Sequence, residues 1–89
     1  EELRFKATAR RNKLLGLWAA GKLGLSGPDA DAYAKAVVIA DLEESGDADV
    51  VRKLRKDFDD KKLAVTDQEI ARAMSEMLAQ AVAQIEAGK

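Results

Sequence analysis

Apolar residues recur at three- and four-residue spacing along most of the chain, a pattern typical of amphipathic helices. The clearest helix starts at Thr66, where Thr66 and Glu69 predict a capping box and Val65 and Ile70 predict a hydrophobic staple. Gly88 marks its end. The predicted core face of this helix consists of Ile70, Met74, Met77, Leu78, Ala81 and Ile85.

A shorter and strongly charged helix is predicted after Asp47, a residue type that favours the N-cap position. Charged side chains occupy most of its surface, so only a narrow face is left for the core. Residues 60–65 then form the connection to the last helix. The predicted core face of this helix consists of Val50, Val51, Leu54 and Phe58.

The segment from Ala30 to Leu42 is apolar almost all round, which predicts the most buried helix of the protein. Pro28 and the acidic residues Asp29 and Asp31 suit the N-terminus of such a helix, where a fixed φ and a negative charge both help. The predicted core face consists of Ala30, Tyr33, Ala34, Val37 and Ala40.

Asp41 falls on that same apolar face. A carboxylate without a partner is costly to bury, so Asp41 is expected at the end of the bundle or beside a cation. The first and second helices are expected to run antiparallel. This arrangement would bring Asp41 close to the basic turn of the first helix, residues 10–13. We therefore predict an ion pair between Asp41 and Arg10, Arg11 or Lys13.

Roughly the first 20 residues are predicted to form one helix whose apolar stripe is interrupted. On a helical wheel, Arg10 and Arg11 project from the apolar face, whereas Phe5 points the opposite way. Because guanidinium groups rarely lie in a core, we expect the helix to leave the bundle at residues 10–13. Residues 1–13 would then be the root of a projecting arm, and residues 14–89 the bundle. The apolar face consists of Leu3, Ala7, Leu14 and Trp18.

Charge favours packing these helices as an all-α, antiparallel four-helix bundle with an extended first helix, in a single domain of 89 residues. Basic residues predominate in 1–24 and 52–62, and acidic residues in 25–51 and 63–89. Segments that fold back on each other therefore meet opposite charge. Where the helices converge, the predicted core contains Trp18, Leu14, Val37, Leu54, Met77 and Leu78.

Several functional classes are disfavoured by the residues that the chain lacks. It has no histidine and no cysteine, so the usual proton shuttle and the best nucleophile are absent, and we expect no enzymatic activity. The aspartate pairs at 29/31 and 47/49 lack the remaining ligands of a calcium loop, so neither a metal nor a cofactor is expected. No apolar run is long enough to predict membrane insertion.

The basic run at residues 52–56 is the best candidate for a nucleic-acid contact. Asp57, Asp59 and Asp60 follow it at once, which favours a solvated face paired to acidic neighbours, and we expect no nucleic-acid partner. A helical protein-interaction module remains. The alternative is a nucleotide-sensing module whose arginine and lysine groups hold a phosphate.

Four stretches carry a resemblance to a known family: ARRNKLLGLWAA at residues 9–20, DAYAKAVV at 31–38, ADLEESGDADV at 40–50 and VRKLRKDF at 51–58. Together they resemble the zeta-subunit family of α-proteobacterial F-type ATP synthases, a small inhibitor of ATP hydrolysis. The similarity covers essentially the whole chain, and the first helix is its most specific motif.

The resemblance implies a four-helix bundle whose mobile N-terminal arm becomes helical and inserts into the catalytic head of the ATP synthase. The arm would wedge between the α and β subunits against the rotating γ subunit, while the bundle anchors outside. It also implies a cytoplasmic protein, a monomer when free, that lies at the inner face of the membrane when bound.

Members of this family begin with a further acidic, phenylalanine-containing segment, whereas this chain begins at EELRFKA. We therefore expect the chain to carry the root of the arm without its tip. The cationic turn suits a carboxylate-lined partner surface, because guanidinium groups bind carboxylates in a bidentate way. The predicted partner-binding residues are Leu3, Arg4, Phe5, Lys6, Arg10, Arg11 and Lys13.

Overall fold

The computed structural model describes residues 2–41 and 47–88, and within them the chain forms four helices. They are α1 (Glu2–Lys22), α2 (Gly27–Ala40), α3 (Ala48–Asp60) and α4 (Asp67–Ala87). The prediction of a helix reaching Leu42 ends outside the described residues. Every described helix corresponds to one of the four periodic segments of the sequence, so the four-helix fold is confirmed.

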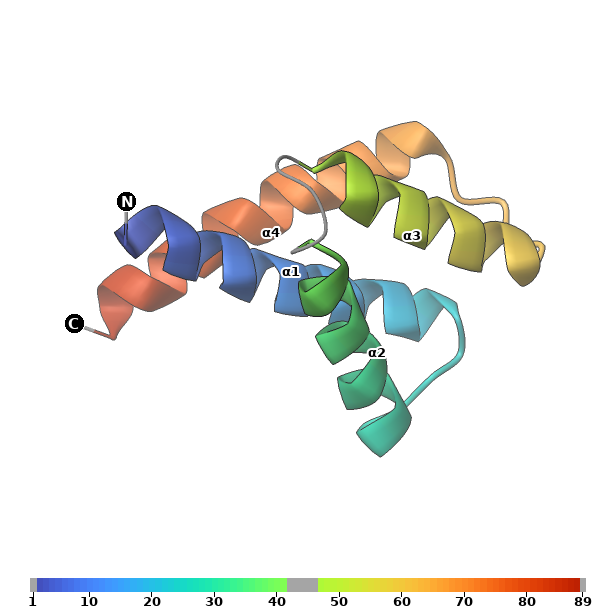
Figure 1. Cartoon of the computed structure of the whole chain (residues 1–89), viewed down its shortest axis with the longest axis horizontal. Coiled ribbons are helices and arrows are strands. Elements are labelled where there is room, and N and C mark those ends of the chain that lie inside the picture. Colours follow the sequence, from blue (N-terminus) through green and yellow to red (C-terminus); the bar gives the residue numbers. More distant parts are fainter. Residues whose placement is uncertain (1, 42–46, 89) are drawn as a thin grey trace.

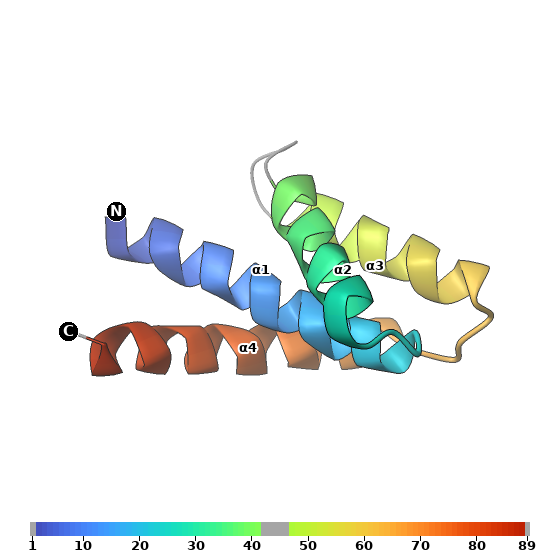
Figure 2. The same ribbon diagram turned by 90° about the horizontal axis from the view of Figure 1, so that it is seen from below.

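The two long helices, α1 and α4, lie side by side and run antiparallel, which places the N- and C-termini at the same end of the molecule (Figure 1). At the other end, α2 crosses α1 steeply, and α3 lies beside the start of α4 (Figures 1 and 2). The molecule is therefore a bundle with three helices gathered around the second half of α1.

Local sequence signals explain where the helices begin and end. The capping box of α4 is confirmed: the Glu69 N–H donates to the Thr66 hydroxyl at 3.1 Å, and the Thr66 N–H donates to the Glu69 carboxylate at 3.2 Å. After α1, Gly24 adopts a φ of 80°, which glycine reaches without strain, and the Leu25 N–H donates to the Ala20 carbonyl at 2.9 Å. This C-cap turns the chain back toward α2.

One hydrophobic core joins all four helices, and the predicted face of α3 is its centre. Phe58 is completely buried, and its ring meets the Trp18 ring edge to face at a centroid distance of 5.9 Å. Val65 and Ile70, the predicted staple, are both buried in it. The buried members of this core are Leu15, Ala19, Val37, Val50, Leu54, Phe58, Val65, Ile70 and Ala73.

Several of the predicted core positions differ from the structure. Val37 and Leu54 are fully buried as predicted, but Leu78 is 40% exposed, and Trp18, Leu14 and Met77 are only half-buried. The buried face of α1 instead contains Leu15 and Ala19, each one residue after the predicted core positions Leu14 and Trp18. The wheel placed the two large side chains at the centre of the face, whereas the structure places them at its edge.

The second helix is less buried than its composition predicted. Ile39 on α2 is 62% exposed, although the predicted face residues Ala34, Val37 and Ala40 are buried. The reason is the steep crossing, which covers one side of α2 and leaves the outer side uncovered (Figure 2). A helix at the edge of a bundle keeps an exposed face even when that face is apolar.

The crossing of α1 and α2 depends on a glycine. A Cβ built on Gly16 would lie 2.6 Å from the Cα of Ala34 and 3.3 Å from a methyl group of Val37. The two backbones therefore approach so closely that no other residue fits at position 16 without moving a helix. Small residues on both sides set the position of α2.

Candidate protein-interaction surface

The predicted partner-binding residues lie on the first half of α1, and the structure brings most of them to the surface. Phe5 is 68% exposed, the most exposed large apolar side chain among the described residues, and its neighbours Arg4 and Lys6 are exposed as well. Arg10 and Lys13 are also exposed. The side chain of Leu3 lies outside the described residues.

Arg11 is the exception, because the structure buries it. Its side chain is 5% exposed and donates two hydrogen bonds to the amide oxygen of Asn12, from Nε at 3.0 Å and from Nη2 at 2.7 Å. Nη2 also forms an ion pair with Asp47 at 2.9 Å. A buried guanidinium needs such partners, so Arg11 holds α1 to the start of α3.

The burial of Arg11 corrects the expected course of α1. Ala7, Arg11 and Asn12 are all buried, so the helix does not leave the bundle at residues 10–13 but stays packed against α4. Arg10 strengthens this packing, since its Nη1 donates to the amide oxygen of Gln84 on α4 at 3.2 Å. The cationic turn is thus a junction between helices.

The predicted ion pair of Asp41 is also wrong. The carboxylate that pairs with Arg11 belongs to Asp47, and within residues 2–41 and 47–88 no ion pair joins Asp41 to Arg10, Arg11 or Lys13. Asp41 is half-buried at the C-terminal end of α2, where it caps the helix through its backbone N–H.

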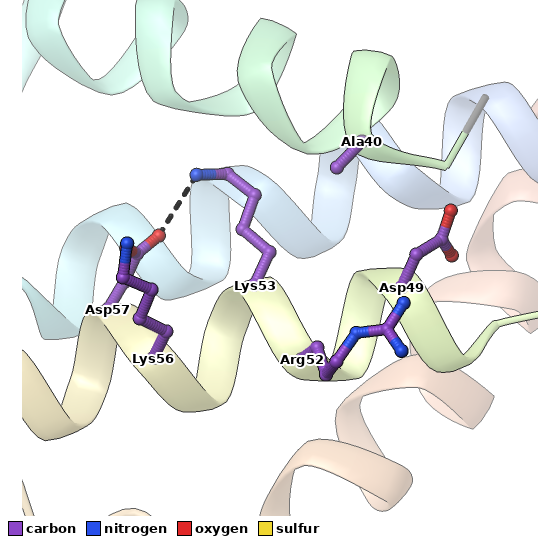
Figure 3. A pocket seen from close by; sticks show the side chains of 6 residues that line it. All are labelled: Ala40, Asp49, Arg52, Lys53, Lys56 and Asp57. Carbon is purple, nitrogen blue, oxygen red and sulfur yellow. Dashed lines mark hydrogen bonds and ion pairs between the residues drawn. The ribbon is translucent and has the colours of Figure 1, made fainter. Parts of the chain in front are cut away.

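A second polar region lies between the end of α2 and the face of α3, in a surface cavity of about 480 Å³ (Figure 3). Three cations and two carboxylates reach it from α3. Lys53 extends toward α2 and donates to Asp57 at 3.0 Å (Figure 3). The lining residues are Ala40, Asp49, Arg52, Lys53, Lys56 and Asp57.

Asp57 in this region also binds α2 directly. The Tyr33 hydroxyl donates to the same Asp57 oxygen at 2.7 Å, and the Lys53 ammonium lies 5.0 Å from the centre of the Tyr33 ring. Burial raises the pKa of Tyr33 far above its ordinary value, and the hydrogen bond to the Asp57 carboxylate raises it further. The hydroxyl therefore stays a donor at any ordinary pH.

The described residues hold no group of three or more histidine, cysteine, aspartate or glutamate side chains that could bind a metal ion. None of the four helices is both long and apolar enough to cross a membrane, as far as the described residues show. The first turns of α1 present an exposed aromatic ring, Phe5, between two exposed cations, Arg4 and Lys6.

Asn12 is a residue that the sequence analysis missed. Its amide oxygen accepts both bonds from Arg11, so it makes the burial of the guanidinium possible. In the sequence it is one of four consecutive polar residues, Arg10 to Lys13, and nothing in the pattern distinguishes it from its exposed neighbours. Only the position of α4 and α3 around α1 identifies the two buried members of that turn.

Comparisons with known proteins agree with this geometry. A search of curated proteins gave no match. A solved structure, determined by solution NMR, is 46% identical in sequence and superposes with a TM-score of 0.87 over 98% of this chain and 99% of its own. A family model described as ATPase inhibitor subunit zeta matches residues 1–84. This match confirms the resemblance carried by the first helix, and the chain belongs to the ATPase inhibitor subunit zeta family.

Proposed function

We propose that this protein inhibits ATP hydrolysis by the catalytic head of an F-type ATP synthase, with the first two turns of α1 as the inhibitory contact. Membership of an inhibitor family supports the activity. The observation that carries the contact is Phe5, which is 68% exposed at the free end of α1. Aromatic and arginine side chains provide most of the binding energy at protein interfaces, and Arg4 lies beside Phe5.

In this proposal the side chain of Phe5 enters a pocket between the α and β subunits, next to the rotating γ subunit. Arg4, Lys6 and Arg10 pair with carboxylates around that pocket, which orients the helix and speeds association. Arg11 has a different role: it stays buried and keeps α1 in place. The bundle remains outside the head, as a monomer in the free protein, cytoplasmic and peripheral to the inner face of the membrane when bound.

The decisive experiment measures ATP hydrolysis by the purified head in the presence of this chain and of Phe5→Ala. We expect inhibition by the chain and at least about a tenfold higher concentration of Phe5→Ala for the same effect. Leu78→Ala is the control, because Leu78 is also an exposed apolar residue but lies on α4. A chain that leaves hydrolysis unchanged contradicts the proposal, and equal inhibition by Phe5→Ala contradicts the role of Phe5.

The same assay tests whether the reach of α1 limits the inhibition. A version with the family's N-terminal segment placed before Glu1 is expected to inhibit more strongly than the chain as it stands. A helix gains about 1.5 Å of reach per residue, so each added turn would extend α1 deeper into the head. Equal inhibition by both versions would show that residues 1–13 suffice.

Nucleotide binding is a second candidate function, and the cavity between α2 and α3 favours it. Arg52, Lys53 and Lys56 reach one cavity of about 480 Å³ together with Asp49 and Asp57, so a phosphate that binds there must compete with the ion pair between Lys53 and Asp57. Titration with ATP, followed by amide chemical shifts, is expected to give saturable changes confined to α3 and the end of α2. Shifts that are absent or spread over the whole chain would exclude this site.

A further inference from the structure

A groove runs between α1 and the outer side of α2, at the steep crossing of the two helices. It has a volume of about 500 Å³ and is mainly apolar, with Ile39 62% exposed at its edge. Among the described residues, only Phe5 is a more exposed large apolar side chain than Ile39. The lining residues are Lys13, Asp31, Ala34, Lys35, Val38 and Ile39.

The charges around this groove differ from those on α3. Lys53 pairs with Asp57 and Arg55 pairs with Asp59 and Asp67, so these cations are neutralised within the chain. Lys13 and Lys35 are exposed, and across the described parts of the chain neither forms an ion pair. The groove thus combines an apolar floor with two cations that no described carboxylate neutralises.

Position connects the groove to the contact proposed above. Lys13 lies eight residues after Phe5, which is about 12 Å along the axis of α1. A partner that holds the first turns of α1 therefore has the groove within reach, on the part of α1 that leads to α2. The two surfaces can be used together without any rearrangement of the bundle.

We propose, on the basis of the proposed function, that this groove is a second docking site that takes an acidic amphipathic helix of the ATP synthase head. An apolar side chain of that helix would pack against Val38 and Ile39. Carboxylates one turn to either side would pair with Lys13 and Lys35, as anchors at helical spacing do in grooves of this kind. The two lysines outnumber Asp31, the one acidic group in the lining, so the groove as a whole favours an acidic helix over a basic one.

In this proposal the two surfaces have different roles. The end of α1 blocks the head, whereas the groove holds the bundle next to it. Because both contacts are on one molecule, binding at the groove raises the effective concentration of the α1 end at its target. Loss of the groove contact should therefore reduce affinity but leave the maximal inhibition unchanged.

The experiment compares binding of Ile39→Ser and Lys35→Glu to the purified head, by calorimetry at low and high salt. Both side chains are exposed, so we expect thermal unfolding like that of the parent chain. We expect Ile39→Ser to bind about tenfold more weakly and Lys35→Glu to bind more weakly with a smaller salt dependence. Leu78→Ser and Arg72→Glu on α4 are the matched controls and should bind within about twofold of the parent.

The outcomes separate the two proposals. If the parent chain binds and inhibits, and both groove variants bind as the controls do, the docking site is wrong and the proposed function stands. If saturating Ile39→Ser no longer inhibits, the groove does not act as an anchor. If the parent chain forms dimers in sedimentation that Ile39→Ser abolishes, the groove takes a second copy instead. If the parent chain does not bind the head, both proposals fail.

Discussion

The two halves of α1 belong to one continuous helix but are held in very different ways. The second half is surrounded by the other three helices, with Leu15 and Ala19 fully buried and Gly16 in backbone contact with α2. In the part of the chain that the structure describes, α4 is the helix that runs beside the first half (Figure 2). The buried residues of the first half are small or polar, Ala7, Arg11 and Asn12, and Arg10 donates a hydrogen bond to Gln84 on α4.

The two halves of α1 contribute unequally to the stability of the protein. Burial of large apolar side chains stabilises the second half, since each contributes roughly 1.5–3 kcal/mol. The first half depends on one half-exposed ion pair, between Arg11 and Asp47, and on an exposed hydrogen bond, which contribute far less. The contact that we propose for Phe5 would therefore draw on a part of α1 that contributes little to the stability of the core.

The largest expected effect comes from the packed half. Phe58→Ala removes a fully buried ring from the centre of the core and should cost about 3–5 kcal/mol of unfolding free energy. Trp18→Ala should cost less, because Trp18 is only half-buried at the edge of the same contact. Urea unfolding of both variants measures the difference. An equal loss would place Trp18 in the centre of the core, as its sequence pattern predicted.

A smaller effect is expected where α1 crosses α2. Gly16→Ala places a Cβ 2.6 Å from the Cα of Ala34, so the helices must separate, at a cost of roughly 1–3 kcal/mol. Gly21→Ala is the matched control: it lies in the same helix with nothing within 4 Å, and should stabilise by about 0.5–1 kcal/mol. Thermal unfolding of the pair should give shifts of opposite sign. A stabilising Gly16→Ala would show that the crossing is loose.

The sequence predicted the fold well wherever a feature depends only on residues close together in the chain. The capping box at Thr66 and the narrow face of Val50, Leu54 and Phe58 are confirmed, because neighbouring residues determine both. The position of Leu15 at the centre of the core was missed by one residue. The apolar side chains of α1 span a wide arc, and only the packing of the other helices selects the buried part of it.

The candidate surface was harder to predict, because the spacing of polar residues along a helix does not distinguish the buried ones from the exposed ones. Phe5 was correctly expected on the outer side, whereas Arg11 was placed at the surface and is buried. Its partner Asp47 is 36 positions away, and its acceptor Asn12 carries no signal in the pattern. The exposure of Ile39 depends on the angle at which α2 crosses α1, which periodicity does not determine.

The ion pair of Arg11 tests how the first half of α1 is held. Arg11→Ala leaves the buried amide oxygen of Asn12 without its two donors and should cost about 1–2 kcal/mol. Asp47→Ala should cost less, because the Asp47 side chain is 53% exposed and Arg11 keeps its bonds to Asn12. A double-mutant cycle by urea unfolding gives the coupling between the two. Zero effect of Arg11→Ala would restore the prediction of an exposed turn.

The smallest effect concerns the polar edge of the packed half, where the Tyr33 hydroxyl donates to Asp57. The folded-state pKa of Tyr33 is raised above its ordinary value of 10.0, so its contribution to stability is complete below pH 10 and is lost as the pH rises further. Tyr33→Phe should therefore lower the free energy of unfolding by about 1 kcal/mol at pH 7. Above pH 10, the free energy of unfolding of Tyr33→Phe should fall less steeply with pH than that of the parent chain. The difference between the two unfolding curves isolates the contribution of the Tyr33 hydroxyl. A gap between the curves that stays constant from pH 7 to pH 11 would show that the phenol ionises as readily in the folded chain as in the unfolded one, and that this edge of the packed half is open to water.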